Sequence, residues 1–174
     1  MKRPDKIKML IVEDDRLIGR MIKDFFEMEG ESYVFLAAES GLEAFDLCLK
    51  EKPDVIITDL MLPGMDGIQL IRQLRELSEF AVTPIVACTA GGPTMESDAM
   101  DAGAHMVLAK PIDQKALVSA VDSLLKVSPF LKPPLLAAGP AEAWKPRSIS
   151  EGIPSLKKLF GWEPGDGSGS GEKS

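Results

Sequence analysis

The sequence has few of the residues from which disulfide frameworks and multidentate metal sites are built. Its 174 residues include two cysteines, Cys48 and Cys88, each in an apolar stretch and not in a CxxC pair, and one histidine, His105. These numbers argue against a disulfide scaffold, a structural zinc site and a metal centre with several histidines. We expect both cysteines to be free thiols in the core of a protein kept in a reducing compartment.

Long apolar segments are also missing. The apolar runs are short, such as residues 9–12 and 135–138, whereas a membrane-spanning helix needs roughly 20 apolar residues. The charged residues near the N-terminus are not followed by an apolar stretch of signal-peptide length. We therefore expect no transmembrane helix and no secretion, which makes a cytoplasmic location the natural expectation.

An excess of positive charge is absent as well. The chain has 20 Lys and Arg against 27 Asp and Glu, a net charge of −7 and a pI near 4.8. Such a charge disfavours broad contact with nucleic acid or with an anionic membrane. No helix-turn-helix pattern follows residue 127, so we expect no direct DNA binding. A GxxxxGK[ST] phosphate loop is missing too, which disfavours a nucleotide site.

The composition divides the chain near Val127. Residues 128–174 hold 7 of the 13 prolines and 7 of the 15 glycines, and a Pro and Gly content of about 30% is typical of disordered sequence. We predict a folded domain over residues 1–127 and a disordered tail over 128–174. Residues 154–162 form either a short amphipathic motif, helped by Lys157 and Lys158, or part of a linker with incidental apolar residues.

Within residues 1–127, short β-rich runs alternate with segments of helical period. This alternation predicts a (βα)5 domain with a parallel sheet. The predicted strands are 7–12, 33–36, 55–58, 85–88 and 106–109. The first predicted helix ends before Gly30, and the others are at 40–50, 67–77, 93–102 and 113–127. Asp113 is the predicted N-cap of the last helix. We expect the nine methionines to serve mainly as core packing.

Polar side chains follow four of the predicted strands. They are Glu13, Asp14 and Asp15 after the first strand, Asp59 after the third, Thr89 after the fourth and Lys110 after the fifth. Ligands of such sheets bind at the carboxyl ends of the strands. Clustered carboxylates repel one another unless a cation or protons intervene, and an all-oxygen site suits Mg²⁺. Asp15 is equally well explained as a helix N-cap, and Asp66 as a turn or cap residue before Gly67.

Five short motifs lie in order along this domain. They are Ile-Val-Glu-Asp-Asp at 11–15, Asp-Leu-Met-Leu-Pro-Gly-Met-Asp-Gly at 59–67, Thr-Ala at 89–90, Gly-Ala at 103–104 and Lys-Pro at 110–111. Together they resemble the receiver domain of bacterial two-component response regulators, over about residues 7–127. The resemblance implies an α/β, doubly wound parallel sheet with the flavodoxin-like strand order 2-1-3-4-5.

The resemblance also implies a metal site. Asp14 and Asp59 would bind Mg²⁺ directly, together with the backbone carbonyl of Met61, and Glu13 would act through a metal-bound water.

The same resemblance makes Asp59 the phosphoacceptor, which would form an aspartyl phosphate. Thr89 and Lys110 would contact the phosphoryl oxygens, and the Lys110–Pro111 peptide bond is expected to be cis. Thr89 would then shift toward the phosphoryl group as a switch residue. The family's second switch residue, an aromatic in the fifth strand, corresponds here to Val107, so we expect weaker or differently transmitted coupling.

We therefore interpret the chain as a stand-alone, phosphoacceptor response regulator and not as a turnover enzyme. Its donor would be a histidine kinase or a histidine phosphotransfer protein. Its output would be an altered contact with an unknown protein partner through the face formed by residues 93–127. The same face could also mediate a homodimer. Two alternatives remain open. One is a degenerate receiver that acts as a scaffold without phosphorylation, and the other a phosphatase with Asp59 as nucleophile, although such enzymes need a second acid where Met61 stands.

Overall fold

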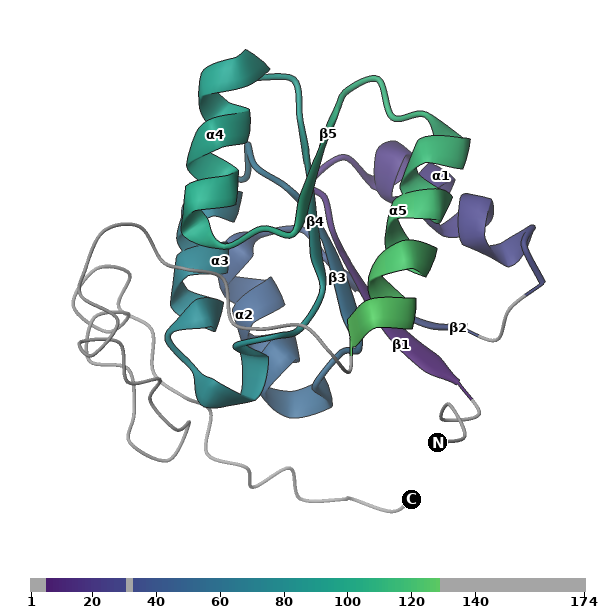
Figure 1. Cartoon of the computed structure of the whole chain (residues 1–174), viewed down its shortest axis with the longest axis horizontal. Coiled ribbons are helices and arrows are strands. Elements are labelled where there is room, and N and C mark those ends of the chain that lie inside the picture. The colour runs from purple at the N-terminus through teal and green to yellow at the C-terminus, as the bar shows by residue number, and fades with distance from the viewer. Residues whose placement is uncertain (1–5, 31–32, 129–174) are drawn as a thin grey trace, which may run out of the picture.

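The protein is a five-stranded parallel sheet with helices on both faces (Figure 1). The computed structural model describes residues 6–30 and 33–128. Its strands are β1 (Ile7–Val12), β2 (Tyr33–Ala38), β3 (Val55–Asp59), β4 (Ile85–Thr89) and β5 (Met106–Ala109). Its helices are α1 (Arg16–Glu27), α2 (Gly41–Glu51), α3 (Gly67–Arg75), the 3₁₀ helix η1 (Ser78–Phe80), α4 (Gly92–Ala102) and α5 (Gln114–Val127). Of the tail predicted at 128–174, residues 129–174, with the motif at 154–162, lie outside the described residues.

The strand order is β2-β1-β3-β4-β5, and all neighbouring strands pair in parallel. This confirms the predicted flavodoxin-like order. The register brings the strand ends level with one another, because Val12 pairs with Thr58, Asp59 with Cys88, and Thr89 with Ala109. The polar residues that end or follow these strands therefore meet at one edge of the sheet.

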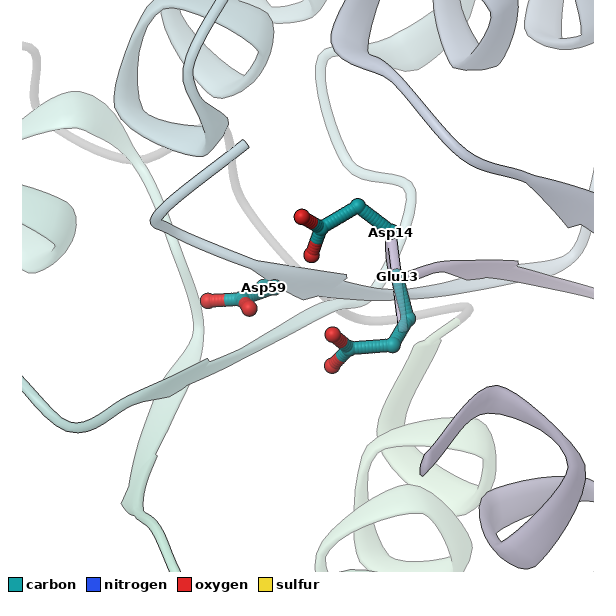
Figure 2. Close-up of side chains that lie close together, drawn as sticks. All are labelled: Glu13, Asp14 and Asp59. Atoms are coloured by element: carbon teal, nitrogen blue, oxygen red, sulfur yellow. The ribbon is translucent and has the colours of Figure 1, made fainter. Parts of the chain in front are cut away.

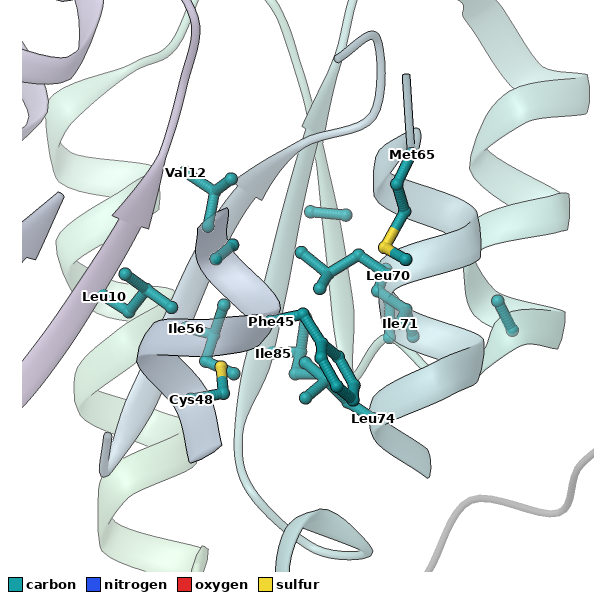
Figure 3. Packing of buried hydrophobic residues seen from close by; sticks show 14 of the residues in the cluster. Leu10, Val12, Phe45, Cys48, Ile56, Met65, Leu70, Ile71, Leu74 and Ile85 are labelled. Atoms are coloured by element: carbon teal, nitrogen blue, oxygen red, sulfur yellow. The ribbon is translucent and has the colours of Figure 1, made fainter. Parts of the chain in front are cut away.

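Two hydrophobic layers enclose the sheet. The α2-α3-α4 layer packs Phe45, Met65, Leu70 and other side chains against one face (Figure 3). The α1-α5 layer packs Phe26, Val121 and other side chains against the opposite face. Because β3 is buried on both faces, it is apolar along most of its length rather than alternating.

The two cysteines lie one in each layer. Cys48 belongs to the α2-α3-α4 layer and Cys88 to the α1-α5 layer, and both are buried and free, as expected. Burial raises the pKa of each thiol to about 12, so neither is a ready nucleophile. Among residues 6–30 and 33–128, no helix combines the length and the apolar composition that a bilayer-spanning segment requires.

Carboxylate caps fix where three of the helices begin. Asp15 accepts hydrogen bonds from the backbone N–H groups of Leu17 and Ile18 at the start of α1. Asp66 forms a reciprocal capping box with Gln69 at the start of α3, and Asp113 caps α5. The capping interpretations of these residues are confirmed, and Asp15 is thus a helix cap.

Two elements, β2 and α3, differ from the predicted boundaries by two residues, and the other bounded predictions are met to within one residue. β2 continues to Ala38, because Ala37 and Ala38 pair with the end of β1 even though alanine has low strand propensity. α3 ends at Arg75, two residues short of the prediction, and η1 follows. The apolar period continues through Leu77, but the chain leaves the helix where the buried Arg75 side chain bonds the carbonyl of Phe80. Tertiary contacts override the local pattern there.

The expectation that the methionines pack mainly in the core is wrong for half of those in the described residues. Met9 and Met65 are fully buried, and Met95 and Met106 are partly buried. Four others are exposed, namely Met21, Met28, Met61 and Met100, at 36%, 76%, 59% and 47%. The exposed Met61 stands two residues after the predicted phosphoacceptor Asp59.

A buried arginine ties together the sheet edge opposite the strand ends described above. Arg75 is 1% exposed, and its Nε donates to the carbonyl of Gly103 over 2.9 Å. One terminal nitrogen donates to the carbonyl of Phe80, and the other lies 3.1 Å from His105 Nδ1. His105 Nδ1 also accepts the backbone N–H of Ile85. The histidine is therefore a structural acceptor that joins α3 to the starts of β4 and β5.

The pH dependence of stability should report this position of His105. Burial and the positive charge of Arg75 lower the pKa of His105 from 6.5 to about 4. The unfolded chain therefore binds more protons between these pH values, and the free energy of unfolding falls as the pH decreases through this window. Because the ring is partly exposed, we expect a loss of about 1 to 2 kcal/mol from this residue.

Urea unfolding of the wild type and of His105→Asn measures this contribution. Asparagine keeps an acceptor near the position of Nδ1 but does not titrate in this range. On going from about pH 7 to about pH 4.5, the free energy of unfolding should fall more for the wild type than for His105→Asn. A difference that is independent of pH would contradict the assignment, and ring NMR of this sole histidine gives the folded-state pKa directly.

Candidate functional site

Three carboxylates meet at the carboxyl edge of the sheet. Glu13 and Asp14 directly follow β1, and Asp59 ends β3, the neighbouring strand. Each offers an oxygen, and these oxygens all lie within 4.8 Å of one another; Figure 2 shows the three side chains converging from the two strand ends. Glu13 and Asp59 are buried, whereas Asp14 is exposed. The site is thus a buried acidic pair with one side open to solvent.

Lys110 reaches this cluster from the end of β5. Its Nζ donates to Asp59 Oδ2 over 2.7 Å and to Glu13 Oε2 over 2.9 Å, and its side chain is 17% exposed. Burial by itself would lower the pKa of Lys110, but the bonds to Asp59 and Glu13 outweigh it, and the pKa is raised. Lys110 is therefore held as a cation against both carboxylates. The Lys110–Pro111 peptide bond is cis, as predicted.

The pKa of Glu13 is raised above its usual value. Its burial raises its pKa, and the nearby charge of Asp59 adds to this, against the lowering effect of Lys110. Three ionised carboxylates and one ammonium group leave two negative charges at the site. An all-oxygen donor set with that charge fits a divalent, oxygen-preferring cation such as Mg²⁺. Glu13, Asp14 and Asp59 are thus the residues that could hold the ion.

The loop after β3 holds the Asp59 carboxylate in place. Asp59 Oδ1 accepts the backbone N–H of Met61 over 2.9 Å, and Oδ2 accepts from Lys110. The loop closes where the N–H of Gly67 donates to the carbonyl of Leu60 over 3.0 Å. Both oxygens of Asp59 are therefore oriented before any ligand arrives. The predicted metal contact of the Met61 carbonyl stays a prediction.

Thr89 lies at the same edge but is not joined to the acidic cluster. It is 1% exposed, and its hydroxyl group lies 2.9 Å from Met95 Sδ while accepting the N–H of Gly91. Val107, the second predicted switch residue, is partly buried against the α2-α3-α4 layer. The structure thus brings Glu13, Asp14, Asp59 and Lys110 together and leaves the Thr89 hydroxyl turned toward α4.

The alternation of side chains along the strands explains this orientation. Asp59 stands two residues after Ile57, which packs in the α1-α5 layer. Thr89 stands two residues after Ala87, which packs in the α2-α3-α4 layer. Residues two apart on a strand point to the same face, so Thr89 starts from the face opposite to that of Asp59. A contact between Thr89 and a group on Asp59 needs a movement of Thr89.

Sequence reasoning missed the contact between Met95 and Thr89. Met95 lies in the first turn of α4, six residues after Thr89, at a position that carries no motif. The two glycines at 91 and 92 are visible in the sequence. The structure shows why glycine suits position 91, since a Cβ there would lie 2.5 Å from Met95 Sδ. The glycine allows the methionine to come close, but this could be recognised only from the folded chain.

Comparison with known proteins agrees with this geometry. Residues 9–122 match the family model described as the response regulator receiver domain. The transcriptional regulatory protein ResD of Bacillus subtilis is 35% identical over 127 residues, which are 72% of this chain and 51% of ResD. The chain spans about half the length of the curated relatives that it matches.

Solved structures give the same result. The receiver domain of the Francisella response regulator 1452 is 32% identical, with a TM-score of 0.63 over 69% of this chain and 97% of that one. The chemotaxis protein CheY4 of Vibrio cholerae is 28% identical, with a TM-score of 0.63 over 68% of this chain and 98% of that one. With motif, fold and site in agreement, the chain belongs to the response regulator receiver domain family.

Proposed function

We propose that the chain is the phosphoacceptor of a two-component phosphorelay and that Asp59 receives the phosphoryl group. The observation that carries this proposal is the position of Lys110 Nζ, 2.7 Å from Asp59 Oδ2 and 2.9 Å from Glu13 Oε2, within the carboxylate cluster. A lysine held there supplies positive charge where an incoming phosphoryl group needs it. A carboxylate that only caps a helix does not require a lysine at this position.

The transfer itself follows from this arrangement. A carboxylate oxygen of Asp59 attacks phosphorus in line, the bond from phosphorus to the donor's histidine nitrogen breaks, and an aspartyl phosphate forms. Lys110 then neutralises charge on the transferred group, and the N–H of Met61 keeps the carboxylate oriented. Mg²⁺, held by Asp14, Asp59 and the Met61 carbonyl and through water by Glu13, would neutralise further charge on the phosphoryl oxygens.

The donor is a histidine kinase or a histidine phosphotransfer protein. Two exposed apolar side chains next to the site suit contact with such a protein, namely Leu17 in the first turn of α1, 79% exposed, and Met61, 59% exposed. Docking of a protein over these side chains would remove their apolar surface from water, which favours the contact. The domain takes up one phosphoryl group and later loses it, so it is a switch and not a turnover enzyme.

The output is a change in protein contacts on the surface formed by α4, β5 and α5, in the cytoplasm. A second copy of this chain or a downstream protein could bind there. ResD and SrrA are named transcriptional regulatory proteins, but the chain spans about half of each, and its charge of −7 disfavours DNA contact by this domain.

Intact mass after incubation with acetyl phosphate and Mg²⁺ tests the proposal. The wild type should gain one phosphoryl group, and it should lose this gain with a chelator or in Asp59→Asn. Asp66→Asn is the matched control, because it changes an acid in the same loop while asparagine still caps α3. Phosphorylation of Asp59→Asn, or a wild type that stays unmodified, would contradict the proposal; the latter would favour the scaffold alternative.

A phosphatase with Asp59 as nucleophile is disfavoured by the same loop. The residue two positions later is Met61, whose side chain is 59% exposed and carries no proton to give a leaving group. A steady release of phosphate over many turnovers would be the result that revives this alternative.

A further inference from the structure

A contact between Thr89 and Met95 has no part in the phosphoryl transfer described above. Thr89 Oγ1 lies 2.9 Å from Met95 Sδ, and the N–H of Gly91 donates to the same hydroxyl oxygen. With its oxygen already accepting from Gly91, the threonine hydroxyl proton is directed to the sulfur. Met95 thus accounts for the resting direction of this hydroxyl group.

The backbone is built to allow this approach. A Cβ at Gly91 would lie 2.5 Å from Met95 Sδ and 2.8 Å from its Cε, so any other residue would push the methionine away. Gly91 is also the N-cap residue of α4 and makes no side-chain cap. The first turn of α4 is therefore connected to the end of β4 through the Thr89–Met95 contact.

Met95 and Val107 pack against the same hydrophobic layer. Both are partly buried against the α2-α3-α4 layer, and Val107 stands on β5 opposite Ala87, two residues before Thr89 on β4. Valine is stiff and offers no hydrogen-bonding group, whereas methionine has several rotatable bonds and a weak acceptor sulfur. Of these two neighbours, Met95 is the one that can respond to a movement of the Thr89 hydroxyl.

We propose that Met95 is the positioning residue for Thr89: it holds the hydroxyl group away from Asp59 at rest and carries its movement to α4 when Asp59 is phosphorylated. A phosphoryl oxygen is a charged acceptor and binds a hydroxyl group more strongly than a thioether does. When Thr89 turns to the phosphoryl group, Met95 loses its donor and repacks on the α4 and β5 surface. This inference rests on the proposed phosphorylation of Asp59.

The resting contact can be tested without phosphorylation. In the full chain carrying ¹³C-methyl methionine, the Met95 and Met100 signals are assigned by Met95→Leu and Met100→Leu. Thr89→Val removes the hydroxyl group and should shift the Met95 methyl signal, while the signal of Met100, which is 47% exposed on the same helix, stays in place. An unmoved Met95 signal would overturn the proposal.

The coupling is tested by the rate of phosphoryl uptake from acetyl phosphate with Mg²⁺. Met95→Leu keeps the side-chain volume but releases Thr89, and we expect uptake to rise about two- to fivefold, the factor that one weak neutral hydrogen bond represents. Met100→Leu should leave the rate unchanged. In a Thr89→Val background, Met95→Leu should have no effect, which a merely structural role of Met95 would not produce.

The outcomes separate this inference from the proposed function. A wild type that takes up no phosphoryl group overturns both. The role of Met95 alone is overturned if the wild type is phosphorylated at Asp59 and Met95→Leu takes up phosphoryl groups at the same rate. It is also overturned if Met95→Leu still changes the rate in the Thr89→Val background.

Discussion

Replacing Arg75 with alanine is expected to lower the free energy of unfolding by about 3 kcal/mol, because Arg75 is buried and satisfies several acceptors. Its side chain is 1% exposed and donates to the carbonyls of Gly103 and Phe80. Removing it leaves the Gly103 carbonyl without this donor, at about 1 to 3 kcal/mol, whereas the Phe80 carbonyl keeps the N–H of Thr83 as a second donor. It also empties the space that the aliphatic stem fills beside Gly103, where an added Cβ would lie 2.8 Å from Arg75 Cγ.

One opposing effect limits the size of this loss. Burial lowers the pKa of Arg75 from 12.5 to about 10, which means that the folded protein bears a cost of about 3 kcal/mol for the buried charge. Alanine relieves that cost, and without this relief the loss would be about twice as large. Among the described residues no carboxylate forms a salt bridge with Arg75. Arg75 therefore contributes to stability through its hydrogen bonds to backbone carbonyls.

Arg72→Ala is the matched control, since Arg72 is exposed in the preceding turn of the same helix. Its loss should change stability by less than about 0.5 kcal/mol. Urea unfolding of both variants gives the comparison. In Arg75→Ala the pKa of His105 should also rise, because the neighbouring positive charge is gone. Equal stability of the two variants would contradict the structural role assigned to Arg75.

Different groups of side chains lie at the two edges of the sheet. Arg75 and His105 join α3, β4 and β5 at the edge where the strands begin. The carboxylates and Lys110 lie at the edge where the strands end. Thr89 can therefore change partners at one edge while the opposite ends of β4 and β5 stay fixed. If Thr89 moves as proposed, stability and switching depend on separate contacts of the same strands.

Most of the site followed from the sequence because parallel strands end at one edge. That rule, applied to Glu13, Asp14, Asp59 and Lys110, required only the strand positions, which the short β-rich runs between segments of helical period made visible. The orientation of Thr89 did not follow, since it depends on which face residue 89 takes and on a methionine without a motif.

The boundary of α3 was missed for a similar reason. The helical period runs through Leu77, and nothing local marks Arg75 as a residue that will be buried. Its partners are the carbonyl at the end of η1, the carbonyl of the residue that caps the C-terminus of α4 and a histidine that comes 30 residues later. A pattern that reads neighbours along the chain cannot detect contacts of that range.

Gly67→Ala is expected to damage both the fold and the site, because Gly67 lies directly against the strand that ends in Asp59. A Cβ there would overlap the Asp59 carbonyl oxygen and lie 2.7 Å from Leu60 Cα. Both obstacles are backbone atoms, so β3 or α3 must shift. Overpacking of this kind costs about 3 kcal/mol. A displacement of Asp59 by about 1 Å would slow phosphoryl uptake by about 100-fold.

Gly19→Ala gives the contrast, since it makes the same substitution in α1. Its Cβ would meet nothing closer than Glu13 Cβ at 3.8 Å, and alanine in a helix interior is favoured over glycine by about 0.5 to 1 kcal/mol. We therefore expect Gly19→Ala to be more stable than the wild type and to take up phosphoryl groups normally. Urea unfolding and acetyl phosphate labelling at low temperature measure both quantities. If Gly67→Ala matched Gly19→Ala in either one, the tight packing of α3 on the phosphoacceptor strand would not be what holds Asp59 in position.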